Sequence, residues 1–130
     1  MGYDVLWRSQ WLWHSFRLSR RNGVWNETWL YSFKGGADGS GPIGTLASDS
    51  AGDLYGTTSD GGAACSCGTI FKLILSGGRP VYSIVHRFNG PPGAGFAYNG
   101  MTPDSTGSNL YGANVHGGPT NDGTIYRLVP

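Results

Sequence analysis

The segment Leu54-Tyr55-Gly56-Thr57-Thr58-Ser59-Asp60-Gly61-Gly62 returns later in the chain as Leu110-Tyr111-Gly112-Ala113-Asn114-Val115-His116-Gly117-Gly118. An Asp-Ser-x-Gly turn precedes each copy, at 49–52 and 104–107. A Gly-Thr-Ile-aromatic-basic-Leu element follows each, at 68–73 and 123–128. The two copies are offset by 55 or 56 residues at every matched position. Self-similarity at a fixed period of this size indicates a repeat architecture.

Each repeat unit predicts short strands joined by tight turns. The first unit has four segments bounded by Gly, Asp and Ser, at 43–48, 54–58, 70–75 and 80–88. The second has counterparts at 97–102, 110–114 and 124–129. A unit of about 50 residues with four strands is typical of a propeller blade. We therefore predict an all-β fold of propeller-like blades with four antiparallel strands each, about two blades plus a partial one.

The positions that recur in both units are predicted to be structural. Repeated Gly suits turns with positive φ, and a Tyr at the same place in both copies favours packing, with ligand stacking as the sharper alternative. These positions are Gly52, Leu54, Tyr55, Gly61, Gly62, Gly68, Phe71, Gly107, Leu110, Tyr111, Gly117, Gly118, Gly123 and Tyr126.

The two motifs resemble the GloVer tandem repeats of bacterial surface and secreted proteins. The likeness covers roughly residues 24–130, and the stretch 31–39 is similar to that family's turn between strands. The second copy departs from the pattern at 88–98, where Asn89-Gly90-Pro91-Pro92-Gly93 replaces Lys-Gly-Gly-x-Asp-Gly. The resemblance implies an extracellular or cell-surface location and a propeller-like fold, and it says little about activity.

Residues 1–21 differ in character from the tandem repeats at 22–130, whose units span about 29–80 and 81–130. Polar residues interrupt the apolar ones in this segment, so it lacks the apolar core of a signal peptide. Trp is encoded by TGG. When a codon that begins with C follows it and the frame moves by one base, the bases read GGC, which encodes Gly. A reading of residues 1–17 shifted in this way, with permissive codons elsewhere, resembles residues 55–71. We therefore interpret 1–21 as an atypical, poorly ordered segment, and hypothesise that residues 1 to about 20 are an out-of-frame reading of a third repeat. An amphipathic membrane-surface helix is the alternative.

Composition and motifs exclude several function classes. The formal net charge of +1 gives no general basis for binding nucleic acid, and no apolar run reaches the ~20 residues of a membrane span. No nucleophile elbow, zinc-peptidase helix or phosphate loop occurs, so we expect no catalytic residues and no cofactor.

Cys65-Ser66-Cys67 lacks the second pair that a zinc site needs, which leaves a local disulfide or two exposed thiols. The Asp residues beside Gly or Ser are predicted to form turns.

We expect a non-catalytic repeat module of a larger bacterial secreted or surface protein, with a scaffold or interaction role. The alternatives are a glycan- or protein-binding propeller module and a fragment of a propeller hydrolase or lyase. Two units cannot close a ring, so the expected partners are further blades of the same protein or a second copy. The candidate ligand-loop residues are Asp38, Asp60, His116 and Asn121.

Overall fold

Eleven β-strands and one short 3-10 helix make up the part of the chain that the computed structural model describes, residues 3–9, 12–62, 64–90, 93 and 95–130. The all-β prediction is therefore confirmed. No helix in these ranges is long and apolar enough to cross a membrane. The elements are β1 (Tyr3–Ser9), β2 (Leu12–Arg21), β3 (Val24–Phe33), η1 (Gly36–Asp38), β4 (Ser40–Ser48), β5 (Leu54–Asp60), β6 (Thr69–Ile74), β7 (Val81–Arg87), β8 (Gly95–Ala97), β9 (Thr102–Pro103), β10 (Leu110–His116) and β11 (Thr124–Leu128).

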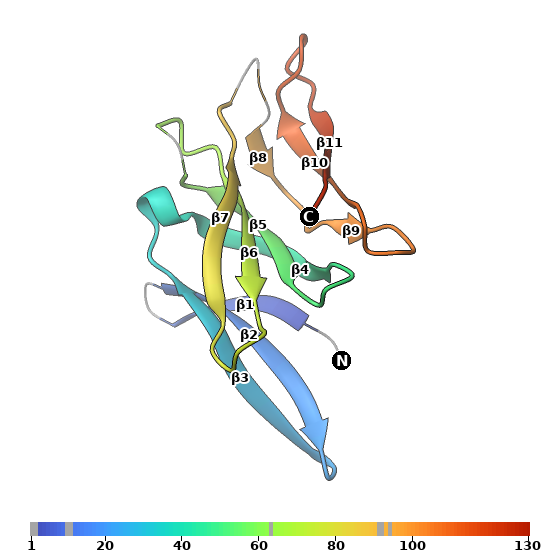
Figure 1. Ribbon diagram of the computed structural model, residues 1–130. Helices are drawn as coiled ribbons and strands as arrows, with labels where there is room; N and C mark the ends of the chain where they lie inside the picture. The colour runs from blue at the N-terminus through green and yellow to red at the C-terminus, as the bar shows by residue number, and fades with distance from the viewer. Residues whose placement is uncertain (1–2, 10–11, 63, 91–92, 94) are drawn as a thin grey trace.

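The strands form two antiparallel sheets (Figure 1). The larger sheet has seven strands in the order β3-β2-β1-β4-β5-β6-β7, and the smaller has the order β11-β10-β8 with β9 also on β10. The predicted propeller blades of four antiparallel strands are not confirmed. We count β4–β7 as the first unit of the structure and β8–β11 as the second. The pairing of Asp4 with Thr45 joins β1 to β4 and merges the N-terminal strands with the first unit. In the second unit two short strands, β8 and β9, share the place that β4 alone takes in the first.

The pairing registers of the two units are the same. Tyr55 pairs with Lys72 and Tyr111 with Arg127, and the other four pairs of the β5–β6 and β10–β11 ladders also correspond. The pair Ala47 and Tyr55 likewise has its counterpart in Thr102 and Tyr111. Since a shift of one residue would turn every side chain to the opposite face, equal registers give both units the same inward and outward positions. The repeat is therefore present in the strand pairing of the structure as well as in the sequence.

Strands β2 and β3 continue the same repeat on the N-terminal side. Phe16 pairs with Trp29 as Phe71 pairs with Ile84, and both ladders have an irregularity at the residue before the Phe. The expected poorly ordered segment at 1–21 therefore lies in strands β1 and β2 where it is described. Asn22 and Gly23 have φ of 52° and 79° and connect β2 to β3 as a two-residue hairpin turn, which the sequence reading overlooked. The shifted-frame origin of this segment stays a prediction.

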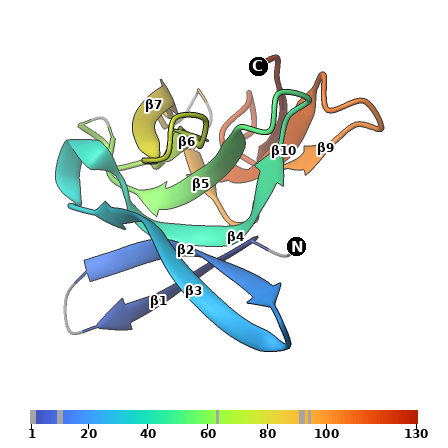
Figure 2. The same cartoon turned by 60° about the horizontal axis from the view of Figure 1, so that its bottom comes forward.

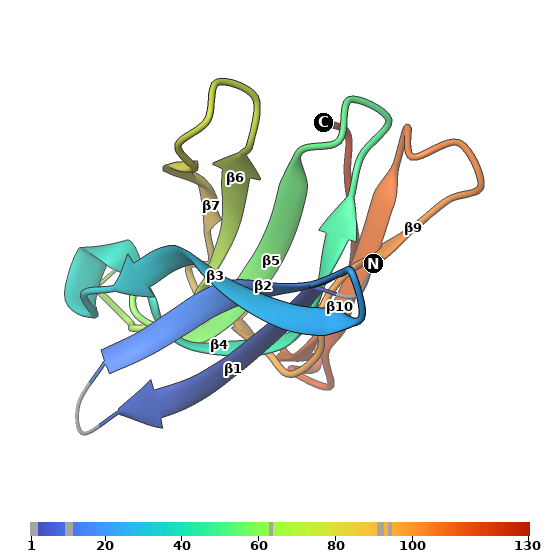
Figure 3. The same cartoon turned by 90° about the horizontal axis from the view of Figure 1, so that it is seen from below.

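Two apolar clusters lie between successive units. One joins Leu30 and Phe33 of β3 to Leu46, Leu54, Phe71 and Leu73 of the first unit. The other joins Ala47, Tyr55, Cys67, Ile70 and Phe88 to Ala97, Met101 and Leu110 of the second. Figure 2 shows β4–β7 lying between β1–β3 and β8–β11, and Figure 3 shows β1–β3 running across the direction of β5 and β6. Each unit therefore has two packing faces, one toward the unit before it and one toward the unit after it.

Candidate functional site

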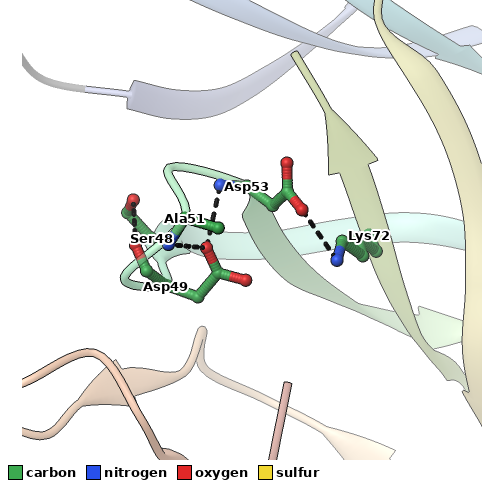
Figure 4. Close-up of polar contacts among 5 residues, drawn as sticks. All are labelled: Ser48, Asp49, Ala51, Asp53 and Lys72. Atoms are coloured by element: carbon green, nitrogen blue, oxygen red, sulfur yellow. Dashed lines mark hydrogen bonds and ion pairs between the residues drawn. The ribbon is translucent and has the colours of Figure 1, made fainter. Parts of the chain in front are cut away.

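The repeated Asp residues at the β4–β5 and β9–β10 turns form the same structure. The Asp49 carboxylate accepts hydrogen bonds from the backbone N–H groups of Ala51 and Asp53, each at 2.9 Å (Figure 4). Asp104 accepts from Thr106 and Ser108 at the equivalent places, each at 3.0 Å. The turn-forming role predicted for these two carboxylates is confirmed.

The two turns also connect the units. Ser50 of the first turn donates its backbone N–H to the carbonyl oxygen of Gly107 in the second, at 3.2 Å. Nearby, the carboxylate of Asp53, just before β5, lies 2.7 Å from the ammonium of Lys72 on the neighbouring strand β6 (Figure 4). The carboxylates of Asp49 and Asp104 thus hold the backbone of their turns, and that of Asp53 pairs with Lys72.

Removing Asn109 is expected to raise the pKa of Asp104. The amide of Asn109, followed by Thr106, donates to the Asp104 carboxylate and holds its pKa well below the ordinary value. A lowered pKa contributes stability above the unfolded value of about 4, and this stability is lost as the pH falls through the lowered pKa. With Asn109→Ala, acid unfolding should therefore begin at a higher pH. Carboxyl NMR titration checks this, with Asn121→Ala as control, and an unchanged Asp104 titration contradicts it.

The four candidate ligand-loop residues lie in two separate pairs. Asp38 ends η1 and Asp60 ends β5, whereas His116 ends β10 and Asn121 lies in the β10–β11 loop. Asp38 accepts from the Tyr31 hydroxyl at 2.6 Å, and Asn121 accepts from the Gly117 N–H at 2.9 Å. Both are therefore occupied in holding their own loops.

The other two members of the set have local contacts as well. Asp60 is exposed and accepts from the hydroxyl of Ser59. The ring of His116 meets Phe96 edge-on, with the ring centres 5.5 Å apart. Among the described residues, no hydrogen bond, ion pair or ring contact joins one of these four side chains to another.

The feature that sequence reasoning missed is a difference in exposure between equivalent positions. We call the side of a unit that faces the next unit its back face: Ala47, Tyr55, Thr57 and Ile70 in the first, Thr102, Tyr111, Ala113 and Ile125 in the second. Tyr55 is 2% exposed and Ile70 3%, whereas Tyr111 is 43% exposed and Ile125 85%. The second unit covers the back face of the first, and no described residue covers that of the second.

Polar groups on the two back faces differ in the same way. In the first unit the Thr57 hydroxyl donates to the carbonyl of Asn99 at 3.0 Å, and the carbonyl of Cys67 accepts from the Phe96 N–H at 2.8 Å. At the equivalent place on the second unit, Asp122 and Ala113 line an open depression with Asn114, Gly123, Thr124 and Ile125. Asn114 alternates with Ala113, so its side chain lies on the other side of β10; its amide oxygen is buried and has no hydrogen-bond partner among the described residues. The back face of the second unit therefore lacks the covering contacts that the first unit receives there.

A second depression lies between β7 and β11. It has a volume of about 260 Å³ and is lined by Ile70, Val85, His86, Phe88, Tyr126, Arg127 and Leu128. Burial raises the pKa of Tyr126 to about 12, and its hydroxyl has no hydrogen-bond partner among the described residues. We call this depression the β11 groove.

The cysteines form a local disulfide, Cys65–Cys67, one of the two arrangements that the sequence left open. Cys67 is buried in the cluster between the units, and the Gly90 turn packs closely on its sulfur. A side chain at position 90 would collide with that sulfur, so the disulfide shapes the connection between the units.

The geometry described above is that of a repeat unit with one uncovered face and one open groove. In comparisons with known proteins, no protein family, no curated protein and no solved structure matches this chain.

Proposed function

We propose that this chain is a non-catalytic repeat module with a scaffold or interaction role, and that its second unit receives another repeat unit on its back face. Four-stranded propeller blades and a place in a larger secreted or surface protein belong to the same proposal, and the resemblance to GloVer repeats supports them. One observation carries it: Tyr111 and Ile125 are exposed at positions whose counterparts are almost completely buried.

Physical chemistry favours a covered back face. Burial of apolar surface contributes about 25 cal/mol per Å², and soluble monomers seldom expose a contiguous apolar patch without a partner. Equal registers place Tyr111 diagonally across from Ile125, as Tyr55 is from Ile70. The face that receives Met101 and Leu110 in the first unit is thus repeated in the second with the same spacing.

The described polar side chains favour a structural role over chemistry. The carboxylates of Asp49 and Asp104 accept backbone hydrogen bonds within their own turns. Asp53 pairs with Lys72, and Asp38 holds the loop after β3. A carboxylate that serves as an acid or base needs access to substrate, and these serve the backbone instead.

Self-association should depend on the back face of the second unit. With no other repeat present, a second copy is the available partner, so the chain is expected to associate with a Kd on the order of micromolar. Tyr111→Lys places a charge in the face and should weaken association at least about tenfold. Val24→Lys, at the exposed β2–β3 turn, is the control and should leave association unchanged. Sedimentation equilibrium measures both, and a chain that stays monomeric up to roughly 100 µM contradicts the proposal.

A further inference from the structure

In the first unit, β7 fills the space that corresponds to the β11 groove. The ring of Tyr82 stacks on Tyr31 with the centres 3.7 Å apart, and lies 5.5 Å from Phe71 and 5.7 Å from Phe33. The Tyr82 hydroxyl donates to the carbonyl of Asp38 at 2.7 Å. A tyrosine of an added strand thus closes the contact between two neighbouring units.

The same aromatic frame recurs one repeat later without that tyrosine. The counterparts of Tyr31, Phe33 and Phe71 are His86, Phe88 and Tyr126, and all three line the β11 groove. Phe88 lies 5.1 Å from His86 and 5.4 Å from Tyr126, measured between ring centres. Among the described strands β11 pairs only with β10, so its other edge is open. The groove and the open edge are adjacent.

We propose that the β11 groove binds an extended peptide strand of the β7 type, which adds to the sheet antiparallel to β11. This rests on the proposed function, in that a further repeat supplies the strand, but it uses the edge of the sheet rather than its back face. The β6–β7 ladder fixes the register: Leu73 pairs with Tyr82 and Phe71 with Ile84. The bound strand therefore places a Tyr opposite Leu128 and an Ile opposite Tyr126.

Backbone and side chains both favour this occupant. An edge strand presents unpaired N–H and C=O groups, and strand addition satisfies them while pockets select alternate side chains. A Tyr at the first inward position would stack on His86, as Tyr82 does on Tyr31. The Ile two residues later would cover the half-buried ring of Tyr126. A peptide without this alternation gains only the backbone pairing.

A synthetic peptide with the sequence of residues 79–88, labelled for fluorescence anisotropy, tests the proposal on the full chain. The Tyr111→Lys chain is used so that self-association does not interfere. We expect binding with a Kd on the order of 10–100 µM, and at least about tenfold weaker binding of the same peptide carrying Tyr82→Ala. His86→Ala in the protein should weaken binding by a similar factor, and Val115→Ala, in β10 and outside the groove, should not.

The strand-binding proposal is overturned by an absence of binding up to roughly 1 mM peptide, or by equal binding of the Tyr82→Ala peptide. Backbone NMR shifts at 124–128 locate the bound peptide on β11, and shifts confined to other strands would also overturn it. The proposed function fails separately, since it depends on self-association of the unchanged protein and on Tyr111. The two outcomes are therefore distinguishable.

Discussion

Replacing Phe71 with Ala is expected to lower the free energy of unfolding by about 3–5 kcal/mol. The Phe71 side chain is completely buried in the cluster that joins β3 to the first unit. Its ring lies 5.1 Å from that of Phe33 and 5.5 Å from that of Tyr82, so truncation removes two aromatic contacts. The cavity also adjoins Gly56, which has no side chain with which to fill it. The cost therefore contains both the transfer of the ring and the cavity left behind.

The repeat supplies the matched control for this change. Tyr126 is the counterpart of Phe71, but its ring is only partly buried because no strand of the β7 type covers it. Tyr126→Ala should cost about 1–2 kcal/mol, less than half as much. Phe71→Leu should cost about 1 kcal/mol and keeps the test readable if Phe71→Ala does not fold. Urea unfolding measures all three, and equal losses for Phe71→Ala and Tyr126→Ala would contradict the difference in covering.

Much of the strand pattern could be predicted because turn-forming residues mark the strand boundaries in both repeat units. Asp49 and Asp104 mark turns through their own side chains, and each second strand begins where the turn ends. Alternation then assigns Phe71 and Leu73 to one face of β6 and Ile70 to the other. The structure has all three side chains buried, on the two sides of the sheet that the alternation indicates. Local signals of this kind depend on neighbours within a few residues.

The rest depends on contacts that such signals do not contain. Tyr55 and Tyr111 have the same neighbours in sequence, yet one is buried and the other exposed, because only the first is followed by a unit that packs on it. The merging of the sheets depends on one pairing between Asp4 and Thr45, residues far apart in the chain. Asn22-Gly23 is a readable local turn signal, but the strand that precedes it, β2, lies within residues 1–21, which were interpreted as outside the repeat.

The open back face and the open groove also have one cause. In the first unit the next unit covers Tyr55, while β7 completes the sheet beside Phe71. The second unit repeats the positions that contact a following unit and a strand of the β7 type. Among the described residues it has neither that unit nor that strand. A surface that is complementary to a repeat at its face and at its edge is what an internal member of a stacked array presents. This favours assembly over a small-molecule site in either depression.

Gly68→Ala is expected to lower the free energy of unfolding by about 3–4 kcal/mol. Gly68 has φ of +93°, and a Cβ there would collide with the backbone oxygen of Thr58. The backbone cannot move away easily, because the Gly68 N–H donates to the carbonyl of Gly61 and its carbonyl accepts from the N–H of Phe88, each at 3.0 Å. To move away from Thr58, the backbone at position 68 would have to break one of these two hydrogen bonds or separate Thr58 from Thr69, the pair at the end of the β5–β6 ladder.

Gly78→Ala separates this collision from the strain of positive φ alone. Gly78 has φ of +87°, but a Cβ there meets nothing within 4 Å, so the change should cost only about 1–2 kcal/mol. The difference between the two variants measures how closely β5 and β6 approach at Gly68. Urea unfolding followed by tryptophan fluorescence gives both values. Equal losses of unfolding free energy in the two variants would mean that the loop before β6 can shift away from Thr58. The inference that a close approach fixes the register at this end of the unit would then be wrong.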